Sequence, residues 1–226
     1  MKSKRKAGTI LVILGCCCLI AAAAFYLCGR AEESSAASES EKLTKTMAAL
    51  IEKSSGAAES DPVAAAEEKS GATEDAALGL PPEESAETDA GASSGGASAV
   101  DVGGYDVAGI LSAPDIDLEL AVISPWSYKN LRAGPCLYSG SPSGRMILLA
   151  HNYSRHFGHL RELQPGASVT FTAADGTVYS YTVTGTEIWA ADQLAQVVSG
   201  SGWDLTLFTC TIGGANRVVV RCAKAG

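Results

Sequence analysis

The sequence predicts a mainly β domain, a closed barrel or a sandwich, behind a single membrane-spanning helix and a disordered spacer. Three observations lead to this fold class. An uncharged run of about 22 residues lies near the N-terminus, and the next 70 or so residues are rich in Ala, Glu, Ser and Gly without an aromatic side chain. The remaining 120 or so contain short apolar runs separated by turn residues. We therefore divide the chain into residues 1–30, 31–102 and 103–226.

The first segment has the features of an N-terminal membrane anchor. Lys2, Lys4, Arg5 and Lys6 precede the uncharged residues 7–28, which are long enough to cross a hydrocarbon core of roughly 30 Å. Basic residues before the span predict a single-pass protein of the cell membrane, with its N-terminus in the cytoplasm and the rest outside. A signal peptide cleaved after the alanines at 21–24, a lipoprotein site at Cys16 and a buried helix of a soluble protein are the alternatives.

Residues 31–100 have the composition of a solvated spacer. They contain 15 acidic and 4 basic residues, and such a segment buries too little apolar surface to offset its ordering entropy. Residues 42–53 have helical spacing and are predicted to form at most a transient helix. If the spacer is only a tether, a fragment that begins near residue 100 keeps its activity in solution.

Short strands are expected throughout the last segment. Asp175-Gly176 is a strong hairpin turn between two of them. Residues 126–131 and 192–198 are the candidate short helices. The predicted strands are residues 107–111, 118–123, 146–150, 169–172, 178–184, 188–189, 205–208 and 217–222.

Charge and cysteine content restrict the possible functions. The net charge of −8 comes from the spacer, and the nearly neutral last segment offers no electrostatic argument for nucleic acid. Three of the seven cysteines lie outside the span: Cys136, Cys210 and Cys222. Either Cys136 and Cys222 form a disulfide and Cys210 is unpaired, or all three are free. No cysteine or histidine spacing is typical of a metal site, so we expect neither a metal nor a cofactor.

The candidate site combines three residue types. Cys210 ends a buried strand, Arg217 begins the next strand after a Gly-Gly turn, and His151 follows an apolar strand 59 residues upstream. A thiolate is a nucleophile, an imidazole can transfer the proton to a leaving amine, and a guanidinium can stabilise an oxyanion. The three together indicate acyl transfer through a thioester.

Other candidates have plainer interpretations. His156 and His159 lie in a polar segment and are expected to be surface loop residues. Arg221 shares a strand face with Arg217 but lies roughly 13 Å from it, so it is a reserve candidate or a structural residue. A lone buried cysteine or a solvated strand-end arginine is the ordinary case; the conjunction with His151 argues against both.

Three separated motifs resemble one known family. Residues 205–222, LTLFTCTIGGANRVVVRC, resemble the signature of sortases, the membrane-anchored cysteine transpeptidases of Gram-positive bacteria. ILLAHN at 147–152 resembles their histidine region, and residues 103–123 resemble their opening strands. The motifs resemble those of class B sortases more than those of class A sortases.

The resemblance implies a fold, a reaction and a set of roles. It implies an eight-stranded sortase-type β-barrel that cleaves an LPXTG-like sorting signal after its threonine, forms an acyl-enzyme on Cys210, and transfers the surface protein to an amine of a cell-wall precursor or a pilin lysine. His151 takes the acid/base role and Arg217 the oxyanion or substrate role. Thr209 and Asn152, beside the cysteine and the histidine, are the expected substrate-binding residues.

Two other function classes compete with this interpretation. Another extracytoplasmic cysteine hydrolase is one. However, papain-like enzymes place the cysteine on a helix before the histidine, and L,D-transpeptidases carry a Ser-His-Gly-Cys-like segment that residues 208–210 lack. A non-catalytic β module that binds surface peptides is the other, and the intact His/Cys/Arg set argues against it.

Overall fold

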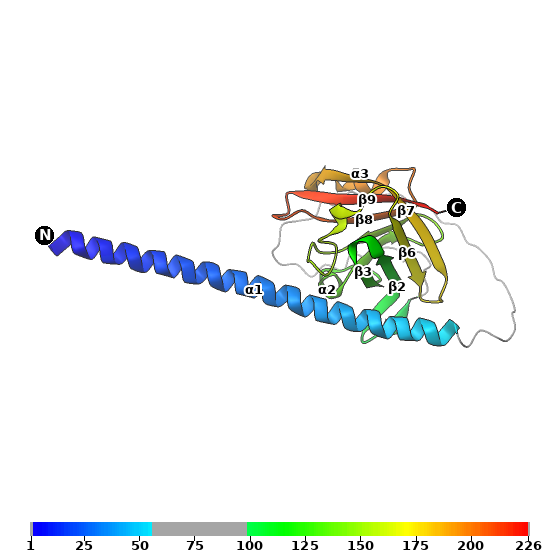
Figure 1. Ribbon diagram of the computed structural model, residues 1–226, viewed down its shortest axis with the longest axis horizontal. Helices are drawn as coiled ribbons and strands as arrows, with labels where there is room; N and C mark the ends of the chain where they lie inside the picture. The colour runs from blue at the N-terminus through cyan, green and yellow to red at the C-terminus, as the bar shows by residue number, and fades with distance from the viewer. Residues whose placement is uncertain (1, 56–98, 226) are drawn as a thin grey trace.

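A long N-terminal helix leads into a β-barrel (Figure 1). The computed structural model describes residues 2–55 and 99–225, and the middle of the predicted spacer lies outside these ranges. Helix α1 (Lys2–Ser55) has 54 residues, a length of roughly 80 Å at 1.5 Å per residue. Its N-terminal half stands clear of the barrel, whereas its C-terminal half lies along it.

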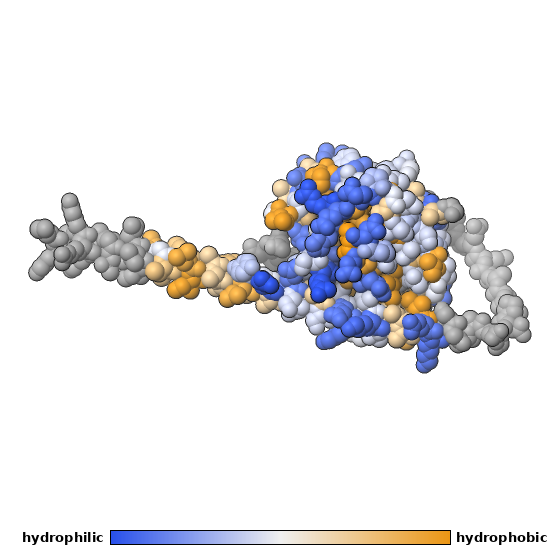
Figure 2. Space-filling view, in the orientation of Figure 1, coloured by the Kyte–Doolittle hydropathy of each residue, from blue (hydrophilic) through white to orange (hydrophobic). Residues whose placement is uncertain are grey.

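From Leu14 on, the protruding part of α1 is largely apolar and solvent-exposed. Leu19, Ile20 and Phe25 are 72%, 69% and 83% exposed, and apolar colour dominates this part of the helix in Figure 2. By length and composition the helix can cross a membrane, and a signal sequence near an N-terminus has the same properties. An exposed apolar surface of this kind needs a lipid-like environment, so its function is either anchoring or targeting.

The described strands form one mixed sheet that closes on itself. The order is β1-β2-β3-β4-β5-β8-β9-β7-β6, and β2 also pairs with β6. Eight strands therefore make the closed barrel, and β1 extends β2 outside it. The pairs β3–β4 and β5–β8 are parallel, and the others are antiparallel. The strands are β1 (Val100–Val102), β2 (Tyr105–Ala113), β3 (Leu118–Ile123), β4 (Cys136–Gly140), β5 (Met146–Leu149), β6 (Ser168–Ala173), β7 (Val178–Ala190), β8 (Leu205–Cys210) and β9 (Asn216–Lys224).

Two apolar clusters lie on opposite faces of the barrel wall. Alternate residues of each strand point to opposite faces. Leu148 and Leu207 therefore belong to the interior cluster, whereas Leu149 and Phe208 belong to a second cluster on the outer face. The second cluster is buried because helices cover it: the C-terminal half of α1, α2 (Tyr128–Ala133) and α3 (Leu194–Ser199).

Most predicted elements are present, with instructive differences. The hairpin at Asp175-Gly176 is confirmed: Gly176 has a φ of 85°, and Asp175 accepts a hydrogen bond from the Thr177 amide at 2.9 Å. The predicted strands at 178–184 and 188–189 are one strand, β7, because the register shifts at a bulge before Gly185 without breaking the pairing with β9. The sequence did not predict strand β4, because its Ser-Gly end resembles a loop; pairing with β5 and, at Cys136, with β3 makes it a strand.

The prediction of a solvated spacer from residue 31 differs from the structure over residues 31–55, which are helical. Leu43 and Met47 are buried in the outer cluster, and the Thr44 hydroxyl accepts a hydrogen bond from the Ala121 amide of β3 at 2.8 Å. A few apolar residues are enough to dock this helix, because the barrel supplies the apolar surface on the other side of the contact. The composition of the segment alone therefore underestimated how much of it is buried.

Replacing Met47 with alanine tests the packing of α1 on the barrel. Met47 is fully buried, so Met47→Ala should lower the free energy of unfolding by roughly 2–4 kcal/mol, as large-to-small core substitutions do. Urea denaturation of the detergent-solubilised chain measures this loss.

The matched control is Leu50→Ala, because Leu50 lies on the same helix and is 38% exposed. It should cost much less. Equal effects of the two substitutions would contradict docking of this segment on the barrel.

Candidate active site

Strands β5 and β8 end, and strand β9 begins, at the same edge of the barrel. Strands β5 and β8 are parallel, with Leu149 opposite Phe208, and the Ala150 amide continues this ladder with a 3.3 Å bond to the Phe208 carbonyl. His151 follows at the level of Cys210. Strands β8 and β9 are antiparallel, and Cys210 pairs directly with Arg217. Register thus brings together three residues that are far apart in sequence.

The same three residues share the outer face of the barrel. Ala150, Leu207 and Val218 belong to the interior cluster, so the residues that follow or precede them by one position point outward. His151 is one residue after Ala150, and Arg217 is one before Val218. Cys210 lies two residues after Phe208, which belongs to the outer cluster. A substrate on the outer face can therefore meet the imidazole, the thiol and the guanidinium together.

Cys210 is the accessible thiol of the barrel. It is half-buried, whereas Cys136 and Cys222 are fully buried, and all three are free. Burial raises the pKa of the Cys136 and Cys222 thiols to about 12, because a thiolate is poorly solvated in an apolar interior. Both remain protonated and inert at neutral pH. Of the two arrangements left open by the sequence, the structure has three free thiols.

Arg217 is held by the turn between β8 and β9. Its Nη1 donates to the carbonyls of Gly214 at 2.9 Å and Asn216 at 3.1 Å. The turn itself needs left-handed backbone at Gly213 and Gly214, with φ of 83° and 74°, which glycine adopts without strain. Arg217 as a residue is 7% exposed, its Nε has no hydrogen-bond partner, and its guanidinium forms no ion pair within the described residues. Its positive charge is therefore not neutralised by a carboxylate.

Thr209 connects the cysteine strand to the histidine strand. Its side chain is 3% exposed, and its hydroxyl donates to the Ala150 carbonyl at 2.7 Å. The residue before Cys210 is thereby bonded to the residue before His151. The hydroxyl is thus bonded to the backbone next to His151, and the substrate-binding role of Thr209 stays a prediction. Asn152 is half-buried in the loop next to His151, and its substrate-binding role stays a prediction.

The loop after His151 folds back onto the barrel. The Phe157 amide donates to the His151 carbonyl at 3.1 Å, and the Gly158 amide donates to the Tyr153 carbonyl at 2.9 Å. Phe157 is fully buried in the interior cluster. A Cβ at Gly158 would lie 2.7 Å from the Tyr153 carbonyl oxygen, so this close approach requires glycine.

Aromatic contacts link the three rings of this loop. His151 stacks on Tyr153, with centroids 4.8 Å apart and planes at 25°, and the Tyr153 ring lies 5.4 Å from that of His156. The expectation that His156 is a surface residue is wrong: it is 1% exposed, because α1 and the folded-back loop cover it. His159 is exposed and lies 2.8 Å from Glu162, as expected for a surface residue.

The buried His156 ring strongly disfavours a proton. Neither ring nitrogen makes a hydrogen bond of standard geometry. Burial lowers the pKa of His156 to about 4, and the neighbouring His151 acts in the same direction. His156 is therefore neutral at physiological pH and is unsuited to being the general acid of the site.

Arg221, the reserve candidate, has a structural environment. Its guanidinium lies 3.8 Å from the centre of the Trp203 ring, donates to the Val197 carbonyl at 2.7 Å and to the Thr206 hydroxyl at 2.9 Å, and lies 3.4 Å from Glu187. These contacts hold the segment that contains α3 against β8 and β9. Within the described residues no three His, Cys, Asp or Glu side chains converge on a possible metal position.

Comparison with known proteins identifies the fold. The model of the sortase domain family matches residues 111–225. Among solved structures, the lid mutant of sortase A from Corynebacterium diphtheriae has 21% identity and a TM-score of 0.50, over 54% of this chain and 72% of that one. Sortase C from Clostridium perfringens with the C-terminal cell wall sorting motif has 22% identity and a TM-score of 0.49, over 54% and 72%.

Sortase D5 from Clostridium perfringens has 17% identity and a TM-score of 0.47, over 54% of this chain and 80% of that one. The chain covers 62% of another structure of the C. diphtheriae sortase A. At these identities the solved structures show the fold alone. No curated protein sequence matches the chain.

Removing the Thr209 hydroxyl should loosen the histidine strand. Thr209→Val keeps the shape but leaves the Ala150 carbonyl without its donor, so we expect a loss of about 1–3 kcal/mol of stability together with slower turnover. Urea denaturation and a turnover assay measure both quantities. Thr209→Ser retains a hydroxyl and should stay close to the wild type; equal losses in both variants would argue against the bond to Ala150.

The neutral His156 should make the fold sensitive to acid. Between its ordinary pKa of 6.5 and the folded value of about 4, only the unfolded chain binds a proton. The free energy of unfolding therefore falls as the pH falls through this window. The loss of stability caused by His156 should reach about 3 kcal/mol by pH 4 and be absent above pH 7.

The comparison of wild type with His156→Phe isolates this contribution, because the carboxylates titrate alike in both chains. Denaturation curves at pH 7, 5.5 and 4.5 should show the smaller loss in the variant. Parallel losses would mean that His156 is not the acid-sensitive group.

Proposed function

We propose, on the premise that this chain belongs to the sortase family of cysteine transpeptidases, that it cleaves an LPXTG-like sorting signal through a thioester on Cys210 and joins the product to an amine. The observation that carries the proposal is the shared outward face of His151, Cys210 and Arg217 at the ends of β5, β8 and β9. One substrate carbonyl can reach all three groups there.

In the first step Cys210 attacks the substrate. Its thiolate sulfur forms a bond with the carbonyl carbon of the threonine, and negative charge develops on the carbonyl oxygen. Arg217 stabilises this oxyanion, and it is well suited to this role because no carboxylate of the described residues pairs with it. When the carbon–nitrogen bond breaks, His151 donates a proton to the leaving amine. The product is a thioester between Cys210 and the threonine carbonyl.

In the second step an amine resolves the thioester. The acceptor nitrogen attacks the thioester carbon, His151 removes a proton from that nitrogen, and the carbon–sulfur bond breaks to regenerate Cys210. One peptide bond is lost and one is formed, so the transfer needs neither an external energy source nor a redox partner. Neutral His156, two rings away from His151, takes no part in these proton transfers.

Substrate and acceptor are proposed from the family. Sortases act on sorting-signal substrates, and the sortase C from Clostridium perfringens is solved with such a motif. We therefore assign surface proteins with a C-terminal sorting signal as donors. A cell-wall precursor amine or a pilin lysine is the acceptor. The similar structures from C. diphtheriae and C. perfringens are class A, C and D sortases. The resemblance of the motifs to class B stays a prediction.

The apolar half of α1 supports a membrane location for the reaction. Sortases are extracytoplasmic, and the exposed helix is long enough to cross a bilayer. With the basic residues 2–6 in front of it, we assign the N-terminus to the cytoplasm and the barrel to the outer side. An uncleaved anchor, rather than a removed signal sequence, keeps α1 attached to the barrel against which its second half is packed.

An acyl-enzyme adduct is the direct test. Incubation of the solubilised chain with a panel of LPXTG-like peptides should give, by intact mass, a species heavier by the peptide fragment that ends in threonine. Cys210→Ala should give none, because the nucleophile is absent. Addition of glycinamide should discharge the adduct as a peptide amide.

Cys28→Ala is the matched control, since it removes an exposed thiol outside the barrel, and it should form the adduct normally. An adduct that persists in Cys210→Ala, or one that only water and never an amine removes, would be evidence against transpeptidation on Cys210.

A further inference from the structure

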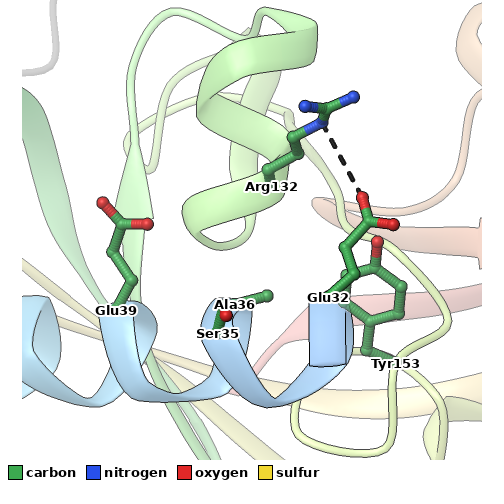
Figure 3. A pocket seen from close by; sticks show the side chains of 6 residues that line it. All are labelled: Glu32, Ser35, Ala36, Glu39, Arg132 and Tyr153. Carbon is green, nitrogen blue, oxygen red and sulfur yellow. Dashed lines mark ion pairs between the residues drawn. The ribbon is translucent and has the colours of Figure 1, made fainter. Parts of the chain in front are cut away.

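The second half of α1 meets the active-site loop as well as the barrel wall. Figure 3 shows a pocket where three elements come together: Glu32, Ser35, Ala36 and Glu39 lie on α1, Arg132 on α2, and Tyr153 in the loop after His151. Glu32 lies 4.0 Å from Arg132. The helix that leaves the apolar segment is therefore in contact with the loop that carries His151.

Glu33 makes the most specific contact in this region. One carboxylate oxygen accepts a hydrogen bond from the Ser154 backbone amide at 2.7 Å and another from the Ser154 hydroxyl at 2.6 Å. These two bonds lower the pKa of Glu33, so the carboxylate is charged at neutral pH. Charge-assisted bonds of this length are among the stronger ones in proteins. They fix a backbone position, since one donor is the Ser154 amide itself.

Ser154 is coupled to His151 by a short path. It follows Tyr153, whose ring stacks on the His151 imidazole. The Tyr153 carbonyl accepts a hydrogen bond from the His156 amide at 2.9 Å, and the centre of the buried His156 ring lies 5.4 Å from that of the tyrosine. The turn from Tyr153 to His156 is thereby a compact unit, and Glu33 holds its outer side. The inner side is held by the burial of His156 next to Ala36 of α1.

We propose that Glu33 is a positioning residue of the reaction: by holding Ser154 it fixes Tyr153 and, through the ring stack, the His151 imidazole relative to the Cys210 thiol. The inference rests on the proposed role of His151. The turn of α1 that carries Glu33 then supports the active site and is not part of a tether, so a fragment that begins near residue 100 lacks this support.

The test compares three variants of the full chain in detergent. Glu33→Ala removes the acceptor, whereas Glu33→Gln keeps an oxygen that can accept both bonds. The matched control is Glu39→Ala: Glu39 also joins α1 to the barrel, through the Tyr105 hydroxyl at 2.8 Å, and this partner lies on β2, outside the histidine loop. Amide hydrogen exchange over residues 151–157, the alkylation rate of Cys210 by peptide mapping, and kcat and KM for a sorting-signal peptide are measured for each.

Glu33→Ala should speed exchange at the Ser154 amide and lower kcat roughly tenfold, with KM within about twofold, because small misplacements of a catalytic group reduce rate more than binding. Glu33→Gln should retain at least about a third of the wild-type kcat, and Glu39→Ala should match the wild type in the loop exchange and in kcat. Ser154→Ala keeps the hydrogen bond from its backbone amide to Glu33 and loses the one from the hydroxyl. Its kcat should therefore lie between those of Glu33→Gln and Glu33→Ala.

The proposal is overturned if Glu33→Ala and Glu39→Ala have the same loop exchange and the same kcat. If the wild type processes no peptide, the proposed substrate is wrong, and hydrogen exchange together with Cys210 alkylation still decides the role of Glu33. If Glu33→Ala does not fold, Glu33→Gln and Ser154→Ala give the answer through the same measurements.

Discussion

Strand β5 pairs in parallel with β8, and this pairing joins residues that are 59 positions apart in the chain. The ladder from Met146 to Leu149 sets the level at which each strand ends, and the Thr209–Ala150 bond closes it one residue before the reactive groups. A slip of one residue would turn His151 toward the interior. The geometry of the candidate site therefore depends on register first and on side-chain contacts second.

The barrel wall separates two environments that the site uses together. Its interior is filled with apolar side chains and contributes rigidity, while helices cover the part of the outer face that holds the second cluster. Cys136 and Cys222 are buried and inert, whereas Cys210 is only half-buried. Reactivity is assigned by burial, because the three thiols are chemically the same group.

Helix α1 gives the protein a direct mechanical connection between its apolar segment and the site. Glu33 comes five residues after the last residue of the uncharged run, a rise of about 7.5 Å along the helix. The end of the barrel that holds His151 and Cys210 therefore lies next to the apolar half of α1. If that half is embedded in a bilayer, the site is close to the membrane surface.

The sequence by itself determined the apolar helix, the strand-rich domain and the identity of the candidate residues, because these depend on local composition, on period-two patterns and on a cysteine, a histidine and an arginine that sit at strand ends. It could not determine that residues 33–47 dock on the barrel, that His156 is buried or that Thr209 points inward. Those outcomes depend on surfaces contributed by distant parts of the chain: β3 covers Thr44, α1 covers His156, and Ala150, just after β5, supplies the acceptor for Thr209. A weakly apolar helix or a polar loop becomes buried only when tertiary structure brings it a partner.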